Sequence, residues 1–405
     1  MEPKIRFKGF EGEWKTSTIG EIAPLSGGYA FQSNHFSSVG IPIVRISNIL
    51  ETGIVGGVFA KYATFDGDAD FRLYDGDAVI AMSGATTGKV AIVHTQGFLY
   101  QNQRVGKFTK TDRVIYDFLT TIVKSHKFRA DLSCLLTSSA QPNASSKDID
   151  SITQSIPLDK DEQQAIGKYF TSLDSQISAS TSRLASLKQM KAASLQAMFP
   201  QEGETVPKIR FKGFEGEWKT CPLYHFAKKR IEKNTKMLYN ITLTNSAEFG
   251  IIDQRNFFDH EISNSENING YYVVRDHDFV YNPRISSSAP VGPINQNKLG
   301  YTGVMSPLYL VFEINGINRD FLEIFFHTTL WHKYMFDNGN TGARFDRLAI
   351  SDEDFMKMPI PDIDIEEQQA IANYFTSLDR QISLQSQRLE KLKQIKSACL
   401  DKMFV

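Results

Sequence analysis

Cysteine is scarce in this sequence of 405 residues, which contains only Cys134, Cys221 and Cys399. These three lie far apart, so they give neither a disulfide framework nor the close spacing of metal ligands. No apolar run approaches the length that spans a membrane, and the first residues contain no apolar signal core. We therefore expect a globular protein in a reducing compartment, with a cytoplasmic location and no membrane partner.

A large net charge is also missing, because 45 Lys and Arg oppose 46 Asp and Glu. DNA-binding proteins owe much of their affinity to neutralised phosphates, so a net charge of −1 argues against a broad basic surface. Small basic clusters do occur at 124–129 and at 228–236, although a solvated face explains such clusters equally well. Any DNA-binding surface must therefore be local, or a partner must supply part of it.

One sequence module occurs twice in the chain. The segment PKIRFKGFEGEWKT at 3–16 returns unchanged at 207–220. A second pair, EQQAIGKYFTSLDSQIS at 162–178 and EQQAIANYFTSLDRQIS at 367–383, follows at almost the same offset. The inserts between these shared segments are nearly equal in length but barely similar in sequence. A shared frame with divergent inserts indicates one common partner and two different targets, although recent recombination would leave the same pattern.

The second shared segment has the apolar periodicity of a long helix. Acidic residues stand in its first expected turn, and about 38 residues would extend ~57 Å. One apolar stripe on so long a helix predicts a partner helix, and the duplicate would serve in an antiparallel coiled coil. Packing of the stripe onto a globular domain is the alternative. The residues expected to pair the helices and dock partners are Phe170, Leu173, Ile177, Leu184, Leu187, Phe375, Leu378, Ile382, Leu389 and Leu392.

The two inserts contain short β-rich runs separated by Gly-rich turns, which indicates mixed domains. The similar turns Asp75-Gly76-Asp77 and Asp276-His277-Asp278 hint at one fold beneath both inserts. The expected fold class is therefore α+β, in which two mixed domains alternate with two long helices that pair as an antiparallel coiled coil, in pseudo-twofold arrangement. The expected segments are an N-terminal domain at 1–157, a first helix at 158–200, a C-terminal domain at 201–361 and a second helix at 362–405.

Catalytic motifs are not recognisable in the sequence. The segment 83–90 resembles a phosphate-binding loop, but only three residues separate its glycines and Val90 replaces the required hydroxyl. The segment 281–284 lacks the second proline and the aromatic residue of the adenine-binding loop of amino-methyltransferases. No histidine stands in a metal-ligand spacing. We therefore predict no catalytic residue, metal site or cofactor in this chain, and we interpret 83–90 as a turn between two strands.

Side chains suited to base edges and phosphates recur in the inserts. Arg can bind guanine, and Asn or Gln can bind adenine, through paired hydrogen bonds, whereas Ser and Thr mostly contact phosphates. Polar loops are common in all proteins, so no single residue is decisive. The candidate DNA-binding residues are Arg45, Ser47, Asn48, Lys89, Gln101, Asn102, Gln103, Arg104, Gln141, Asn143, Tyr281, Asn282, Arg284, Ser286, Arg344 and Arg347.

The order of variable domain, shared helix, variable domain and shared helix resembles the specificity (S) subunit of Type I restriction-modification enzymes. The EQQAI…YF…LD…I stretches at 162–177 and 367–382 resemble the conserved regions of that family. Residues 40–45 and 75–89 resemble its target-recognition domains. The resemblance covers essentially the whole chain, and the doubled frame is its most specific part.

The resemblance implies a non-catalytic subunit of an adenine-N6 methyltransferase and ATP-dependent endonuclease complex. Each target-recognition domain would read one half of a bipartite, asymmetric site in double-stranded DNA. The helix pair would set the spacing and dock two methyltransferase subunits. S-adenosylmethionine, ATP and magnesium would bind to these and to restriction or motor subunits. An autonomous methyltransferase or nuclease, and a coiled-coil scaffold without a DNA role, are the alternatives.

Overall fold

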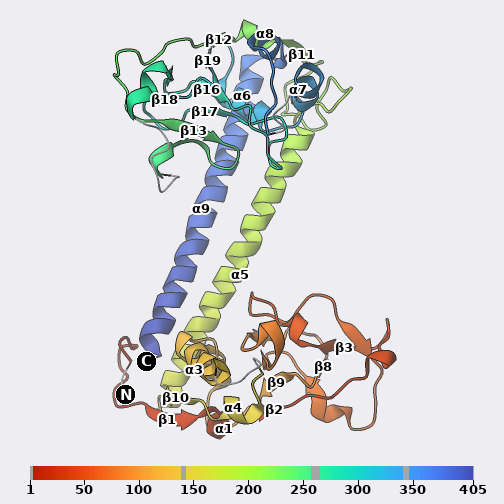
Figure 1. Ribbon diagram of the computed structural model, residues 1–405. Helices are drawn as coiled ribbons and strands as arrows, with labels where there is room; N and C mark the ends of the chain where they lie inside the picture. Colours follow the sequence, from red (N-terminus) through yellow and green to blue (C-terminus); the bar gives the residue numbers. More distant parts are fainter. Residues whose placement is uncertain (1–2, 138–142, 257–264, 341–345, 405) are drawn as a thin grey trace. The chain divides into compact units, whose positions relative to one another are not determined.

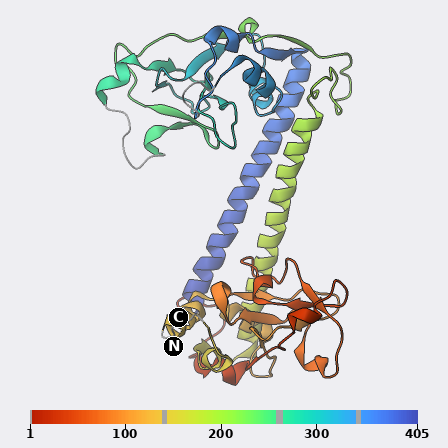
Figure 2. The ribbon, with the colours of Figure 1, turned by 45° about the vertical axis from the view of Figure 1, so that its right-hand side comes forward.

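The computed structural model describes residues 3–137, 143–256, 265–340 and 346–404. The chain forms two compact units, and each contains one insert together with parts of both long helices (Figure 1, Figure 2). Unit 1 comprises Met1–Ser182 and Gln387–Val405, whereas unit 2 comprises Arg183–Ser386. This division cuts through both helices, so the four segments expected from the sequence stay a prediction.

Short strands form the body of unit 1. They are β1 (Lys15–Thr18), β2 (Leu25–Ser26), β3 (Ile41–Val44), β4 (Ala60–Tyr62), β5 (Arg72–Leu73), β6 (Ala78–Ala81), β7 (Val90–Ile92), β8 (Leu99–Gln101), β9 (Val105–Phe108) and β10 (Thr153–Ile156). One sheet has the order β2-β9-β6-β7 with antiparallel neighbours. A second sheet has the order β4-β3-β8-β5, in which β3 and β8 are parallel. The strands β1 and β10 pair at the two ends of the insert.

Unit 2 is built from a matching set of strands. They are β11 (Lys219–Pro222), β12 (Ala227–Lys229), β13 (Leu243–Ser246), β14 (Gly250–Asp253), β15 (Tyr272–Val274), β16 (Phe279–Tyr281), β17 (Ile294–Gln296), β18 (Gly303–Met305), β19 (Leu310–Ile314) and β20 (Pro359–Asp362). One sheet has the order β12-β19-β16-β17, and β11 pairs with β20. The pairs β13–β14 and β15–β18 are joined by a parallel bridge between Thr242 and Val304.

The two inserts therefore share one topology, as their similar turns suggested. The sheet β2-β9-β6-β7 corresponds strand for strand to β12-β19-β16-β17. In the turns that precede β6 and β16, Asp77 and Asp278 each accept a hydrogen bond from the backbone N–H three residues earlier, at 2.8 and 2.7 Å. Both turns place a residue in the left-handed region, Gly76 at φ 80° and His277 at φ 69°. Glycine adopts this conformation freely, whereas His277 holds it under strain.

Short helices cover the first sheet of each unit. Unit 1 contains α1 (Ile19–Ile22), α2 (Tyr116–Ile122), α3 (His126–Thr137) and α4 (Ser146–Asp150), and unit 2 contains α6 (Arg319–Phe326), α7 (His332–Asn338) and α8 (Asp352–Met356). Their caps follow from the sequence, because Ser145 and Ser351 each accept a hydrogen bond from the N–H three residues later. Fully buried Phe118 and Phe321 tie α2 and α6 to the two cores.

None of the helices in the described part of the chain has both the length and the apolar character needed to span a bilayer.

The two long helices are α5 (Lys160–Ala197) and α9 (Ile365–Met403), and they pair within each unit. In unit 1 the Tyr169 hydroxyl lies 3.5 Å from Cys399 Sγ, and Lys396 Nζ lies 2.5 Å from Asp174 Oδ1. Residue numbers rise along one helix while they fall along the other. The pairing is therefore antiparallel in unit 1, as the apolar stripe predicted.

Unit 2 repeats these helix contacts at equivalent positions. The hydroxyls of Tyr374 and Ser194 lie 2.9 Å apart, and Lys191 Nζ lies 2.6 Å from Asp379 Oδ1. The residue pairs correspond to those of unit 1 under the repeat offset, with the roles of α5 and α9 exchanged. Of the expected pairing residues, six are buried and four are half-buried. The buried ones are Phe170, Leu173, Leu187, Phe375, Leu378 and Leu389, and the half-buried ones are Ile177, Leu184, Ile382 and Leu392.

Each unit takes the end of a long helix from the other repeat. In unit 1 the ring centroid of Trp14 lies 6.1 Å from that of Phe404, which follows the end of α9. In unit 2 the ring of Trp218 lies 5.6 Å from Phe199, which follows the end of α5. All four side chains are buried. The identical frame segments are thus retained because each must bind the same helix end.

A buried ion pair fastens the frame segment to the start of a long helix in both units. In unit 1, Arg6 Nε and Nη2 donate to the two carboxylate oxygens of Glu162, each at 2.7 Å. Arg210 binds Glu367 in the same bidentate manner in unit 2, again at 2.7 Å. The carboxylates are only 1% and 2% exposed, so each depends on its arginine for compensation of its charge.

The chain ends in unit 1 are arranged like an internal connection of unit 2. The N–H of Ile5 donates to the carbonyl of Lys402 at 3.3 Å, and the N–H of Ile209 donates to the carbonyl of Ala197 at 2.9 Å. These two hydrogen bonds are equivalent under the repeat. The connection after α5 is therefore a template for joining the two ends of the chain.

We expect a circular permutant that is opened between Glu202 and Gly203 to fold with a stability within about 1 kcal/mol of the original chain, or a few degrees in melting temperature. Four added residues between Val405 and Met1 would reproduce the seven-residue spacing between Phe199 and Pro207. Thermal unfolding measures the outcome. A permutant opened inside β6 is the destabilised control, and equal loss of stability in both permutants would contradict the prediction.

Candidate nucleic-acid interface

Several loops of unit 1 meet at one edge of its sheets. Met82, at the end of β6, donates its N–H to the carbonyl of Arg104 at 2.9 Å and accepts a hydrogen bond from the N–H of Ala144 at 2.9 Å. The N–H of Asn102 donates to the carbonyl of Val44 at 3.1 Å, because the parallel strands β3 and β8 end at the same edge. We call this surface the first loop cluster; it comprises 45–48, 82–89, 102–104 and 143–145.

Three buried polar atoms of the first loop cluster have no hydrogen-bond partner among the described residues. They are Arg45 Nε, Ser83 Oγ and Thr86 Oγ1. The Arg45 guanidinium lies over the Phe36 ring, 5.9 Å from its centroid, so the ring holds it near this edge. Buried polar groups without partners are costly, and native sites with several of them often bind a polar ligand or ordered water.

Other candidates of unit 1 stand at the surface of the same cluster. The exposed ones are Ser47, Gln103, Arg104 and Asn143. Asn102 is half-buried, and its side-chain oxygen accepts a hydrogen bond from the N–H of Arg104 at 3.3 Å, which orders the turn. Lys89 forms an ion pair with the exposed Glu51. The structure thus brings together residues that lie far apart in the sequence.

Two candidates of unit 1 have structural roles instead. Asn48 is 1% exposed, and its amide nitrogen donates to the carbonyls of Gly56 and Val58, each at 3.0 Å. Gln101 is fully buried, and its amide nitrogen donates to the carbonyl of Val105 at 2.8 Å. These hydrogen bonds satisfy backbone carbonyls of the surrounding loops. Asn48 and Gln101 were predicted to contact DNA, but in the structure they support the first loop cluster from inside.

The equivalent edge of unit 2 carries a second loop cluster, which comprises 245–246, 282–293 and 346–348. The N–H of Leu348 donates to the carbonyl of Pro283 at 2.9 Å, which matches the bond between Ala144 and Met82 in unit 1. An antiparallel bridge joins Arg284 to Arg347 next to this bond. The same strand ends therefore gather loops in both units, but the loop sequences differ completely.

An asparagine network supports the second loop cluster. The side-chain nitrogen of Asn245, which is 2% exposed, donates to the carbonyl of Val280 at 2.7 Å. Asn282 donates its amide to the carbonyl of Asn245 at 2.8 Å, and Asn295 donates to the side-chain oxygen of Asn245 at 2.7 Å. Asn282 and Asn295 are half-buried. Their remaining polar atoms can still meet a ligand at this edge.

The charged and hydroxyl candidates of unit 2 are more accessible. Arg284 and Ser286 are exposed, whereas Arg347 is half-buried and lies 4.0 Å from Asp346, at the limit of an ion pair. The candidates Gln141 and Arg344 lie outside the described residues.

Tyr281 was also predicted to bind DNA, but like Asn48 it is buried. It is 3% exposed, and its hydroxyl donates to the carbonyl of Val291 at 3.0 Å. Burial raises the pKa of Tyr281 above its ordinary value. Its ring packs against Phe355, with centroids 4.9 Å apart. The tyrosine therefore belongs to the core beneath the second loop cluster.

The loop clusters contain three residues that were not predicted, namely Ser83, Thr86 and Asn245, and unpredicted Asn295 supports the second cluster from β17. The segment 83–90 was interpreted as a strand-to-strand turn, and it does connect β6 to β7. The hydroxyls of this segment were therefore not included among the predicted DNA-binding residues. A turn rich in Ser and Thr beside a predicted strand end could have indicated phosphate contacts. Asn245 and Asn295 gave no signal, because their neighbours come from other parts of the chain.

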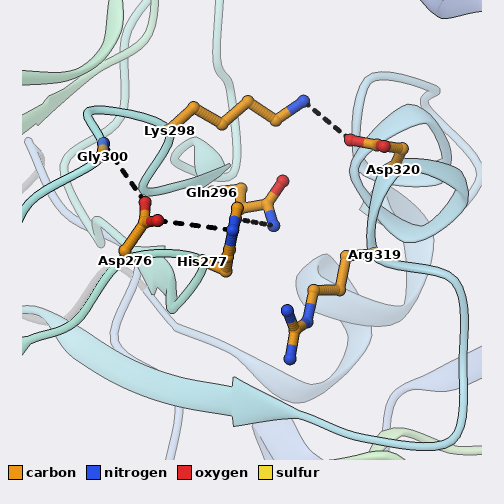
Figure 3. A pocket seen from close by; sticks show the side chains of 7 residues that line it. All are labelled: Asp276, His277, Gln296, Lys298, Gly300, Arg319 and Asp320. Atoms are coloured by element: carbon orange, nitrogen blue, oxygen red, sulfur yellow. Dashed lines mark hydrogen bonds and ion pairs between the residues drawn. The ribbon is translucent and has the colours of Figure 1, made fainter.

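A polar pocket of unit 2 opens near the starts of β16 and α6, at the other end of the hairpin from the loops of the second cluster (Figure 3). Its volume is about 490 Å³. Two acidic side chains, Asp276 and Asp320, and two basic ones, Lys298 and Arg319, line the pocket, so its charges are largely balanced (Figure 3). Arg319, which is exposed, has no ion pair among the described residues. Balanced charge makes this pocket less suited to phosphates than the loop clusters.

Within the described ranges, no group of His, Cys, Asp or Glu side chains is arranged to hold a metal ion.

Comparison with known proteins identifies the class to which this architecture belongs. A family model described as the Type I restriction modification DNA specificity domain matches residues 11–189. The S subunit of a Type I restriction-modification system from M. genitalium matches with a TM-score of 0.62 at 13% identity, over 100% of this chain and 99% of that one. A chain from a structure of type I R-M complex assembly and conformational transition matches with a TM-score of 0.50 at 16% identity, over 97% and 98%. No match was found among curated proteins.

Residues 11–189 thus match the Type I restriction modification DNA specificity domain. The family model covers the first insert and most of α5, and the second insert repeats the same topology. The fold of the whole chain is that of a solved S subunit. Its role is therefore that of a DNA sequence-specificity subunit, a non-catalytic component whose partners are DNA and the other subunits of such a system.

Proposed function

We propose that each unit reads one half of a bipartite, asymmetric site in double-stranded DNA, and that the loop clusters are the reading surfaces. The observation that carries this proposal is the pair of loop clusters at equivalent edges of two sheets with one topology. Equivalent scaffolds would present their loops to DNA in the same way. Because the loops differ in sequence, the two half-sites should differ as well.

The chemistry of the loop clusters supports base reading. The first cluster has exposed Arg104 and buried polar atoms of Arg45, Ser83 and Thr86 that no described residue hydrogen-bonds. The second has exposed Arg284 beside an ordered asparagine network. Arginine forks recognise guanine, asparagine amides recognise adenine, and hydroxyls bind phosphates. A local arrangement of this kind requires no large positive charge on the whole protein, which agrees with the net charge of −1.

We further propose that the helix pair sets the distance between the half-sites and docks two methyltransferase subunits. Between α5 and α9, unit 2 has a depression of about 290 Å³ whose lining includes Leu187, Met190 and Tyr374. Met190 is 51% exposed, which is unusual for a residue on the apolar stripe of a paired helix. The helix contacts of unit 1 repeat those of unit 2, so two like partners could bind two like surfaces.

The chemistry itself would then reside in the partners. The methyltransferase subunits would bind S-adenosylmethionine and modify adenine, while restriction or motor subunits would use ATP and magnesium. The complex would act on DNA in the cytoplasm. An autonomous enzyme is the competing function, and methyl transfer by the purified chain alone would favour it.

The test of this proposal is to co-express the chain with a methyltransferase subunit and map methylated adenines in genomic DNA. We expect an interrupted, asymmetric recognition sequence. In the same assay, Arg104→Ala should relax one half-site and Arg284→Ala only the other, each with about tenfold to hundredfold weaker discrimination at one base pair. These two arginines belong to different units, so each substitution should leave recognition of the other half-site unchanged.

The matched controls are Arg129→Ala in unit 1 and Arg319→Ala in unit 2, which remove exposed arginines outside the loop clusters. Both should leave the methylation pattern unchanged. A continuous or symmetric recognition sequence would contradict the division into two readers. A uniform loss of affinity in Arg104→Ala or Arg284→Ala, without any change of preferred base, would instead mark that arginine as a phosphate contact.

A further inference from the structure

A tight turn of unit 2 presents two apolar side chains to solvent. It lies between β12 and β13, at 233–239, and we call it the wedge turn. Met237 is 48% exposed and Leu238 is 71% exposed, although both belong to a residue class that usually packs inside. Neither side chain belongs to a core cluster of unit 2. The two exposed apolar side chains are adjacent in the sequence, at the tip of the turn.

The wedge turn is held rigidly from beneath by Asn234. This residue is 3% exposed, and its side-chain nitrogen donates to the carbonyl of Tyr239 at 2.7 Å while its side-chain oxygen accepts the N–H of Tyr239 at 3.1 Å. Its backbone carbonyl accepts the N–H of Met237 at 2.9 Å, and its own N–H donates to the carbonyl of Tyr271 at 2.9 Å. These four hydrogen bonds hold the backbone of the tip in its turn.

The backbone of Met237 is strained in this turn. Its φ is 52°, in the left-handed region that glycine and asparagine adopt more easily than a residue with a long side chain. His277 is the other non-glycine residue with positive φ in the described chain. Strained residues persist where the surrounding structure enforces them, and they are concentrated at functional sites. A methionine here is explained if its side chain must project from the tip.

Two lysines precede the apolar residues in the sequence of the wedge turn. Lys233 and Lys236 are exposed and form no ion pair within the described part of the chain. The nearby Glu232 does not neutralise them, because it lies 2.9 Å from Arg275 in an ion pair of its own. The wedge turn thus combines an apolar tip with two exposed lysines that form no ion pair with any described residue, which suits a partner with a dense row of negative charges and an apolar interior.

We propose that the wedge turn inserts Met237 and Leu238 between stacked base pairs of the DNA, while Lys233 and Lys236 bind the flanking phosphates. Apolar side chains that enter a base step from the minor groove partly unstack it and kink the duplex. A protein partner is less suited, because two side chains cover far less area than a stable protein interface requires. The inference rests on the proposed function of unit 2 as a DNA reader.

Unit 1 has no equivalent of the wedge turn among its described residues. The segment between β2 and β3 directs Phe31 and Phe36 into a small aromatic core with Tyr100, and its exposed Val39 stands between Ser38 and Gly40, without an apolar neighbour in the sequence. All residues of unit 1 with a left-handed φ in the described ranges are glycines. The kink should therefore occur only in the half-site read by unit 2.

The test uses the chain in complex with its methyltransferase subunit and duplexes that carry 2-aminopurine at successive steps of the mapped site. We expect fluorescence to rise at one step of the unit 2 half-site, because unstacking removes quenching. Met237→Ala combined with Leu238→Ala should abolish this rise and weaken DNA binding about tenfold. Lys233→Ala combined with Lys236→Ala should lower the slope of log affinity against log salt by about two.

Ile231→Ala is the matched control, because Ile231 is 73% exposed and lies just outside the wedge turn. It should change neither fluorescence nor affinity. If the complex binds its site selectively but no base step shows unstacking, the proposed insertion of the wedge turn is wrong and the proposed function stands. If the complex shows no selectivity at all, the proposed function itself fails. Loss of methyltransferase binding or of binding to anionic vesicles in the Met237 and Leu238 variant, with DNA binding intact, would also overturn the wedge.

Discussion

Replacement of Arg6 by alanine is expected to destabilise unit 1 by about 3–5 kcal/mol, the usual loss when one member of a buried ion pair is removed. Glu162 is 1% exposed and receives two hydrogen bonds of 2.7 Å from this arginine, so its charge would be left buried without compensation. Urea unfolding measures the total loss. Hydrogen exchange should localise it to unit 1, because unit 2 has its own pair, Arg210 and Glu367.

Two further variants test the cause of this loss. Arg210→Ala should shift the instability to unit 2 by a similar amount, because the two pairs have the same geometry and the carboxylate of Glu367 raises the pKa of Arg210. A double replacement of Arg6 and Glu162 by methionine should restore much of the stability, since no uncompensated charge remains. A loss below about 1 kcal/mol in Arg6→Ala would show that the pair is not important to the frame.

A matched lengthening of both long helices is expected to widen the gap between the two half-sites. Seven residues inserted after Ser182 and seven after Ser386, at the boundary between the units, would add ~10.5 Å to each helix. Seven residues are close to two turns, so the apolar stripes would still face each other. At ~3.4 Å per base pair the gap should grow by about three base pairs. Methyladenine mapping gives the result directly.

The control for this experiment is an insertion of seven residues at Gly203, in the exposed connection after α5. That insertion changes no helix length and should leave the gap as it was. Insertion into α5 alone should disrupt the pairing and reduce binding. An unchanged gap after the matched insertion would refute the helix pair as the element that sets the spacing.

The long helices and the doubled frame were predictable because their signals are local and repeated. The apolar positions of 160–197 recur in 365–403, and the structure pairs the two segments antiparallel in each unit. The shared topology of the inserts was only hinted at by two Asp-containing turns. Short strands give weak signals, and the identity of a sheet depends on partners that lie far away in the sequence.

The candidate site was predictable in part. Loops rich in Arg, Ser and Asn were recognised, and the structure gathers most of those it describes into two loop clusters. Asn48, Gln101 and Tyr281 were misassigned because their side-chain chemistry suits DNA as well as it suits buried carbonyls. Met237 and Leu238 were not considered, since an apolar residue near a lysine cluster is a common sequence feature. Their significance comes from exposure and from a strained backbone.

By itself the sequence determined that this protein is one module written twice, with two long amphipathic helices and two different inserts. Periodicity and repetition are properties of neighbouring residues, and they persist whatever the chain does elsewhere. Only the tertiary structure decided that each frame segment packs against the helix end of the other repeat. Trp14 packs against Phe404, and Trp218 packs against Phe199. The tertiary structure also decided which polar side chains are buried. Both depend on contacts between segments far apart in the chain, and no local pattern encodes which of those contacts form.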